Sequence, residues 1–183
     1  MRRITLIVWM LVAATASAQQ IDLKSLDRFG AKAKEKTEIN MDEPMVKTAE
    51  GFLSEEKPGE AGVKKSVAGL KGFYLRVFEF EDKDAYKMED LKPLLDQLKA
   101  PNWVSFLRAQ ERSGLTEIWM LRTKGEDDGI LLIAAEGREL TVINAIGVTR
   151  LHDLSSLGKF GELAARQEKP QPDKAPGSQK KDD

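Results

Sequence analysis

The sequence of 183 residues contains no cysteine and one histidine, His152. Without cysteine, the chain has no disulfides, zinc–thiolate sites, iron–sulfur clusters or cysteine nucleophiles. A single histidine excludes a metal centre built on several histidines of one chain. The sequence also lacks the glycine patterns that hold phosphates and the G-x-S-x-G turn of serine hydrolases. We therefore expect no cofactor, no metal and no enzymatic activity.

An excess of positive charge is also absent. The chain has 29 basic and 30 acidic residues, which gives a formal net charge of −1. A balance of this kind provides no overall basic field for nucleic acid, so we expect no nucleic-acid partner. The hydrophobic content of 41% and the charged content of 32% are typical of one soluble globular domain.

The N-terminus has the three regions of a secretory signal peptide. Arg2 and Arg3 are followed by the apolar stretch Ile4 to Val12, and Ala16 to Ala18 reads small-x-small. We predict a signal peptide over residues 1–18 with cleavage between Ala18 and Gln19. The alternatives are an uncleaved anchor or a buried first helix. The apolar stretch is shorter than the roughly 20 residues that span a bilayer, so we expect no transmembrane segment after cleavage. The mature chain is expected outside the cytoplasm, in the periplasm or beyond.

The C-terminus is rich in charge and proline. Residues 166–183 (RQEKPQPDKAPGSQKKDD) contain no aliphatic side chain larger than alanine, so they cannot bury enough apolar surface to order themselves. We predict a flexible segment over residues 19–24, a single folded domain over 25–161 and a disordered tail over 162–183.

Periodic apolar residues predict the secondary structure of the first half. Asp42 is expected to cap a helix whose stripe is Met45, Ala49, Phe52 and Leu53. The other predicted elements are a helix over Asp22 to Lys36, a strand over Thr37 to Met41, a helix around Val63 to Leu70, a strand over Gly72 to Glu81 and a helix over Met88 to Leu98, with Pro93 in its first turn.

The second half reads as a β-meander with short connections, which require antiparallel neighbours. Its predicted strands are Trp103 to Glu111, Thr116 to Lys124, Gly129 to Glu136 and Glu139 to Val148. A final short helix or ordered loop is expected over Asp153 to Phe160.

These elements predict the α+β class: one antiparallel sheet, formed by the C-terminal four-strand meander plus one or two earlier strands, with helices mainly on one face. Ile130 to Ala135 (ILLIAA) is apolar at every position, which predicts a central strand covered on both sides. If helices cover one side only, the other side needs sheet curvature, a further helix or a second chain. We therefore predict a homodimer or a protein partner that binds through a sheet face.

Arginines in three predicted strands are the candidate ligand-binding residues. Arg76, Arg108 and Arg122 could share a sheet face and form an anion site, with Tyr74 beside Arg76 at period two. The alternative is cross-strand pairing of these arginines with acidic residues, namely Glu79, Glu111 and Glu117.

Other polar groups have simpler interpretations. His152 and Asp153 lie close to Ser155 and Ser156 in sequence, which favours helix capping over a catalytic triad that uses either serine. The carboxylates of Glu126 to Asp128 lack a calcium-loop pattern and are expected to form a solvated turn.

Several segments resemble a known bacterial family. They are LDRFGAKAKEKTEINMDEPMVKTAEGFLSEEKP (26–58), LKGFYLRVFEFEDKDAY (70–86), LKPLLDQLKAPNW (91–103) and ELTVINAIG (139–147). In these segments the chain resembles the bacterial domain of unknown function 4252 family. The resemblance implies an exported bacterial protein of unassigned activity and provides no functional residue to carry over. Members often have a lipid-anchor cysteine, which this chain lacks, and some are encoded near sigma-factor and anti-sigma genes.

Three functional hypotheses follow. The first is a non-enzymatic, exported binding or interaction module of the cell envelope. The second is a regulatory protein linked to envelope stress or to a sigma and anti-sigma pair. The third is a small hydrolase or lyase in which Glu79 or Glu81 pairs with Glu117 for acid–base catalysis.

Overall fold

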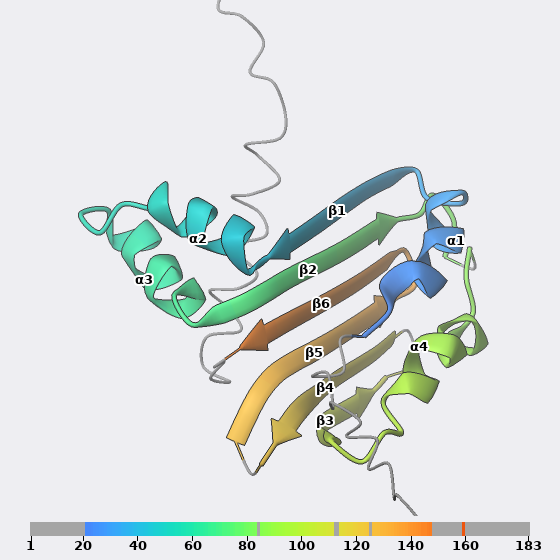
Figure 1. Ribbon diagram of the computed structural model, residues 1–183. Coiled ribbons are helices and arrows are strands. Elements are labelled where there is room, and N and C mark those ends of the chain that lie inside the picture. The colour runs from blue at the N-terminus through green and yellow to red at the C-terminus, as the bar shows by residue number, and fades with distance from the viewer. Residues whose placement is uncertain (1–20, 84, 112–113, 125, 148–158, 160–183) are drawn as a thin grey trace, which may run out of the picture.

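A six-stranded antiparallel sheet organises the described part of the chain, with strand order β1-β2-β6-β5-β4-β3 (Figure 1). The structure is a computed structural model and describes residues 21–83, 85–111, 114–124, 126–147 and 159. The predicted α+β class with a single antiparallel sheet is confirmed. The signal peptide, the Ala18–Gln19 cleavage site, His152, the predicted final helix apart from Lys159, and the C-terminal tail lie outside the described residues.

The last four strands form the predicted meander, and two earlier strands complete the sheet. The strands are β1 (Glu35–Asp42), β2 (Leu70–Glu79), β3 (Trp103–Gln110), β4 (Gly114–Thr123), β5 (Glu126–Glu136) and β6 (Glu139–Gly147). The helices are η1 (Leu23–Leu26), α1 (Asp27–Gly30), α2 (Glu43–Gly51), α3 (Pro58–Val67), η2 (Met88–Leu91) and α4 (Lys92–Gln97).

Strand β5 lies between β6 and β4, so the prediction that the ILLIAA strand is central is confirmed. Leu131 and Ile133 belong to one buried cluster, whereas Leu132 packs against a second. Because successive side chains of a strand point to opposite faces, the two clusters lie on opposite sides of the sheet.

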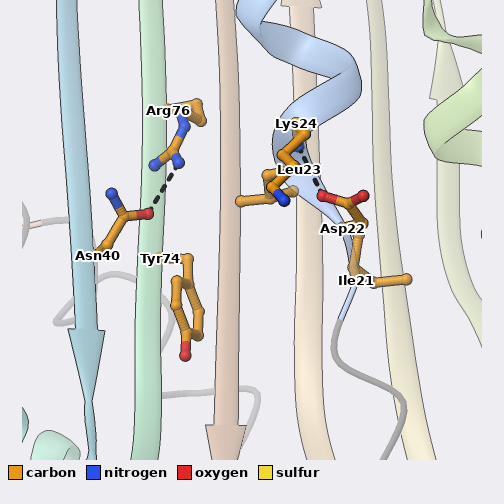
Figure 2. A pocket seen from close by; sticks show the side chains of 7 residues that line it. All are labelled: Ile21, Asp22, Leu23, Lys24, Asn40, Tyr74 and Arg76. Carbon is orange, nitrogen blue, oxygen red and sulfur yellow. Dashed lines mark hydrogen bonds between the residues drawn. The ribbon is translucent and has the colours of Figure 1, made fainter.

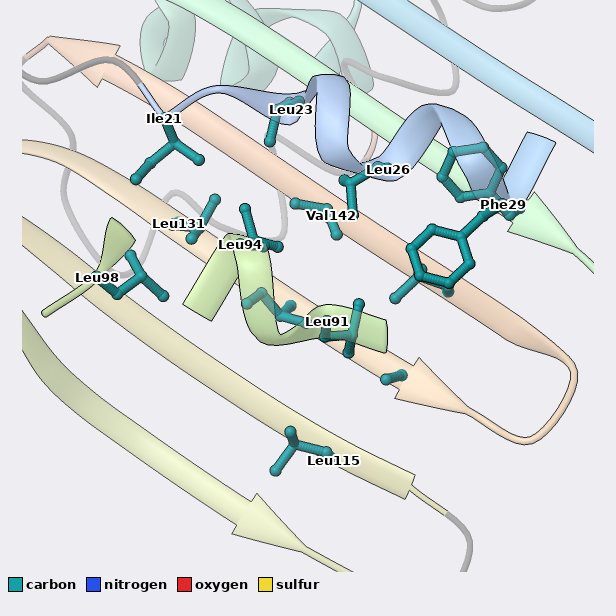
Figure 3. Close-up of a cluster of buried hydrophobic side chains, with 14 of the residues drawn as sticks. Ile21, Leu23, Leu26, Phe29, Leu91, Leu94, Leu98, Leu115, Leu131 and Val142 are labelled. Carbon is teal, nitrogen blue, oxygen red and sulfur yellow. The ribbon is translucent and has the colours of Figure 1, made fainter. Parts of the chain in front are cut away.

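Helices therefore cover both faces, and the prediction of helices mainly on one face is corrected. We call the face covered by η1, α1, η2 and α4 the first face and the face covered by α2 and α3 the second face. On the first face, Figure 3 shows Leu26 and Leu94 on either side of Val142, in one buried cluster. On the second face, Val46, Val63 and Val67 pack with Phe73 and Ile143. The physical reason is that β2, β6 and β5 present apolar side chains in both directions, and each face needs its own cover.

The N-terminal segment is part of the first-face core. Ile21 and Leu23 are buried, and Figure 3 shows both beside Leu131 and Leu94. The prediction of a flexible segment over 19–24 is therefore wrong for residues 21–24, because burial of these two side chains stabilises their position. The helix predicted to reach Lys36 ends at Gly30, and β1 begins at Glu35.

Helix α2 begins as predicted, with the Asp42 carboxylate accepting a hydrogen bond from the Met45 backbone N–H at 3.0 Å. Its apolar stripe lies differently from the prediction. Val46 and Leu53 face the sheet, whereas Phe52 is 70% exposed. In α4, Pro93 lies in the first turn, as predicted.

Candidate functional site

A cavity of about 360 Å³ opens on the first face, between the edge of the sheet and the N-terminal segment. Strands β1 and β2 provide its floor, and the residues before and within η1 provide its wall (Figure 2). Its lining consists of Ile21, Asp22, Leu23, Lys24, Asn40, Tyr74 and Arg76. Two of these side chains are cationic and one is acidic, so the lining carries a formal charge of +1.

Strand register brings the floor together. Tyr74 pairs with Asn40 on β1, and Arg76 follows Tyr74 by two residues, so all three point to the first face. The intervening residue, Leu75, belongs to the second-face core. The same alternation that builds the core therefore places these polar groups beside one another.

The wall is attached to α4 by a pair of hydrogen bonds. The Asp22 backbone N–H donates to Gln97 Oε1 at 2.8 Å, and Gln97 Nε2 donates to the Asp22 carbonyl oxygen at 3.0 Å. The Asp22 carboxylate caps η1 by accepting from the Lys24 backbone N–H at 2.9 Å. These bonds and the burial of Ile21 hold the segment beside the cavity.

Gly72 determines where the Tyr74 ring lies. A Cβ atom at Gly72 would come within 2.9 Å of Tyr74 Cε2, so the ring occupies space that any other residue would fill. Figure 2 shows the ring extending away from Arg76. The glycine thus leaves the space next to Arg76 open instead of covered by the aromatic ring.

The Arg76 side chain is buried with incomplete hydrogen bonding. Arg76 is only 8% exposed. Its Nη1 donates to the carbonyl oxygens of Ile39 at 3.2 Å and Leu75 at 2.8 Å, and its Nη2 donates to Asn40 Oδ1 at 2.8 Å. Its Nε is buried and has no hydrogen-bond partner. Among the described residues, none of the ion pairs includes Arg76.

Asn144 is a second buried polar group with unused hydrogen-bonding atoms. It is the cross-strand neighbour of Tyr74 on β6, lies on the first face, and is 1% exposed. Both Nδ2 and Oδ1 are buried without a partner. Buried polar groups are hydrogen-bonded in most proteins, so this unpaired amide next to an incompletely paired guanidinium marks the site.

A second cavity of about 300 Å³ lies on the same face at the other side of the sheet, and its lining residues Arg108 and Tyr86 have partners. Glu117 is 2% exposed, and its carboxylate accepts from Trp119 Nε1 at 2.8 Å and pairs with Arg108 Nε at 3.1 Å. The Tyr86 hydroxyl donates toward two backbone carbonyl oxygens, and burial raises the pKa of Tyr86 to about 12. Among the described residues that line this cavity, none has a buried side-chain nitrogen or oxygen without a hydrogen-bond partner.

The structure separates the predicted arginine cluster. Tyr74 and Arg76 share the first cavity. Arg108 lies in the same cross-strand row but four strands away, about 19 Å at the usual strand spacing, and makes the alternative pairing with Glu117. Arg122 is exposed after an irregularity in β4. The sequence-based prediction did not include Asn40 or Asn144 among the site residues. For Asn144, a polar residue inside the apolar run VINAI was an available signal.

The predicted acid pair does not form. Glu79 follows Phe78, a first-face core residue, so its side chain points to the second face, whereas Glu117 lies on the first. Three strand spacings, about 14 Å, also separate them. Glu81 lies beyond the end of β2 and is exposed.

Residues 21–83, 85–111, 114–124, 126–147 and 159 contain no group of three or more acidic or histidine side chains that could hold a metal ion. In the same part of the chain, no helix has the length and apolar character needed to cross a membrane.

The chain matches a known protein family. The model of the domain of unknown function DUF4252 matches residues 29–157. The chain belongs to the DUF4252 family. The DUF4252 match includes Asn40, Tyr74, Arg76 and Asn144, but begins after the cavity wall at residues 21–24. No curated protein and no solved structure matches the chain.

The unpaired amide predicts a stabilising substitution. Leucine has the shape of asparagine without its polar atoms, so Asn144→Leu should raise the free energy of unfolding by about 1–2 kcal/mol, since an unsatisfied buried amide is removed. Denaturant unfolding of the two proteins measures the difference.

Asn40→Leu is the matched control, because Asn40 flanks Tyr74 on the other side but accepts a hydrogen bond from Arg76. That variant should lose stability. A loss of stability in Asn144→Leu would mean that Asn144 is already satisfied, for instance by buried water.

Proposed function

We propose that this chain is an exported, non-enzymatic binding module of the cell envelope that holds a small oxyanion beside Arg76. The observation that carries the proposal is the buried Arg76 guanidinium, which has a free Nε and belongs to no ion pair among the described residues. Burying a charge is costly unless a partner compensates it. An anionic ligand would supply that partner.

The cavity supports this proposal by its size and its lining. Its volume lies at the lower end of the range of small-molecule sites, which is about 300–1,000 Å³. Its lining consists of groups that bind and orient, namely a guanidinium, an amide and a phenol. The carboxylate of Asp22 is engaged as a helix cap, which favours binding over acid–base chemistry.

Binding at Arg76 predicts a specific spectroscopic response. Acetate or inorganic phosphate added at low ionic strength should shift the Arg76 Nε–H signal in a ¹⁵N–¹H correlation spectrum, and the shift should saturate. Arg76→Met should weaken binding about tenfold or more, because charge-assisted bidentate bonds are lost.

Arg138→Met is the charge-matched control, since Arg138 is exposed in the β5–β6 turn. It should bind the anions as the parent does. If the Arg76 signal responds to neither anion, or if both variants weaken binding equally, Arg76 is a structural residue and the proposal fails.

Export has its own test. Protein isolated from the cell envelope fraction or medium of the bacterial source should begin at Gln19, because the small residues before it match a signal-peptidase site. Intact mass measurement and N-terminal sequencing identify the first residue. Recovery of chains that retain Met1 would contradict the proposed export.

We also propose that the module associates with a second copy through β3, the sheet edge opposite β1. This strand has the exposed apolar side chains Val104, Phe106 and Leu107, of which Phe106 is 55% exposed at an irregularity between Ser105 and Leu107. An apolar edge strand is a template for pairing with another chain.

Light scattering over a concentration series measures this association. Phe106→Ser should weaken it, whereas Phe52→Ser, which removes an exposed ring from the opposite end of the sheet, should leave it unchanged. A parent protein that remains monomeric at all concentrations would exclude the dimer.

A further inference from the structure

Two groups with unsatisfied polar atoms lie at the first cavity: Arg76 lines it, and Asn144 lies under the covered part of the sheet next to the lining residue Tyr74. Together they describe a ligand. This inference rests on the proposed function. Arg76 aligns with Val142 and Asn144 aligns with Tyr74, so Arg76 and Asn144 are diagonal neighbours on β2 and β6. Such neighbours on one face have Cβ atoms roughly 7–8 Å apart. We infer that the ligand is an N-acylated amino acid or a short peptide with a free C-terminus, whose carboxylate binds Arg76 and whose amide binds Asn144.

The guanidinium selects the carboxylate. Both Nη1 bonds go to backbone carbonyls and one Nη2 bond goes to Asn40, so the donors left over are Nε–H and the second Nη2–H. Two parallel donors match the two oxygens of a carboxylate. The lining has a formal charge of +1, which one carboxylate neutralises, whereas a phosphate monoester brings a charge of about −1.5 to −2.

The second group selects an amide. Asn144 has an unpaired donor, Nδ2, and an unpaired acceptor, Oδ1. A secondary amide offers the complementary acceptor and donor side by side, so one group of the ligand can satisfy both atoms. A simple fatty acid would leave them unpaired, and a site built to hydrogen-bond a ligand discriminates strongly against such an analogue.

Entry of this ligand requires the wall to move. The Nε of Arg76 and both polar atoms of Asn144 are sealed from solvent. Ile21 and Leu23 belong to the same cluster as Leu131, the cross-strand neighbour of Asn144, so the N-terminal segment covers this part of the sheet (Figure 3). The polar attachment of that segment to α4 is the exposed pair of bonds between Asp22 and Gln97. The Gln97→Leu variant should therefore bind the ligand with a faster association rate.

The experiment compares three probes on the mature chain by titration calorimetry at one low ionic strength. Acetylglycylglycine carries both recognition groups, its C-terminal amide carries only the amides, and hexanoate carries only the carboxylate. Acetylglycylglycine should bind about tenfold or more tightly than either of the others, because each lacks one partner for a buried group.

The Asn144→Leu variant separates the two groups. It should bind hexanoate as the parent does and lose the preference for acetylglycylglycine. Gln110→Leu is the matched control, because it removes an amide from the lining of the second cavity. It should keep the preference for acetylglycylglycine over hexanoate. If Asn144→Leu does not fold, the side-chain amide signals of Asn144 in the parent serve instead, and they should shift with acetylglycylglycine but not with hexanoate.

The outcomes distinguish this inference from the proposed function. Equal affinity for acetylglycylglycine and hexanoate would overturn the amide subsite and leave anion binding at Arg76 intact. Equal affinity for acetylglycylglycine and its amide would overturn the role of the carboxylate and, with it, the proposed function. No binding of any probe would overturn both.

Discussion

The burial of β5 on both faces is the constraint on which the rest of the structure depends. Leu131 and Ile133 point to the first face and Leu132 points to the second. On the neighbouring strand β6, Val142 points to the first face and Ile143 to the second. A sheet with two apolar faces needs two covers, and no single helical layer can supply both. The α2–α3 pair covers the second face. The first face is covered by α1 and α4 together with the segment that contains Ile21 and Leu23.

The candidate site follows from this arrangement. The N-terminal segment lies over the first face, beside the edge formed by β1 and β2, and leaves a cavity at the boundary. Gly72 lets the Tyr74 ring lie along β2, so the space beside Arg76 stays open. Strand register places a guanidinium with an unpaired Nε and an amide with two unpaired atoms on this face, and hydrogen bonds to Ile39, Leu75 and Asn40 hold the guanidinium. Such groups reduce the stability of the fold, and sites that bind ligands commonly carry this cost.

The second buried charge provides the contrast. Glu117 is more deeply buried than Arg76, yet its oxygens accept from Trp119 and pair with Arg108. The two groups lie in one cross-strand row, on the same face of the same sheet. Among the described residues, Glu117 forms an ion pair and Arg76 forms none. Burial alone therefore does not identify a site, and the missing partner is the informative feature.

The sequence by itself determined the local elements: the meander, the central strand, the Asp42 cap of α2 and the position of Pro93 in α4. These depend on patterns of two to four residues, which local sterics and hydrogen bonding translate directly into strands, turns and caps. It also identified the family through segments that span most of the folded part. Only the tertiary structure decided which face each helix covers, that Ile21 and Leu23 belong to the core, and that Arg108 forms the ion pair with Glu117. Strand order places Arg108 opposite Glu117, and it places Arg76 opposite Glu38 and Val142 with Asn40 and Asn144 as diagonal neighbours. That order arises from contacts between residues far apart in the chain, which a local pattern does not encode.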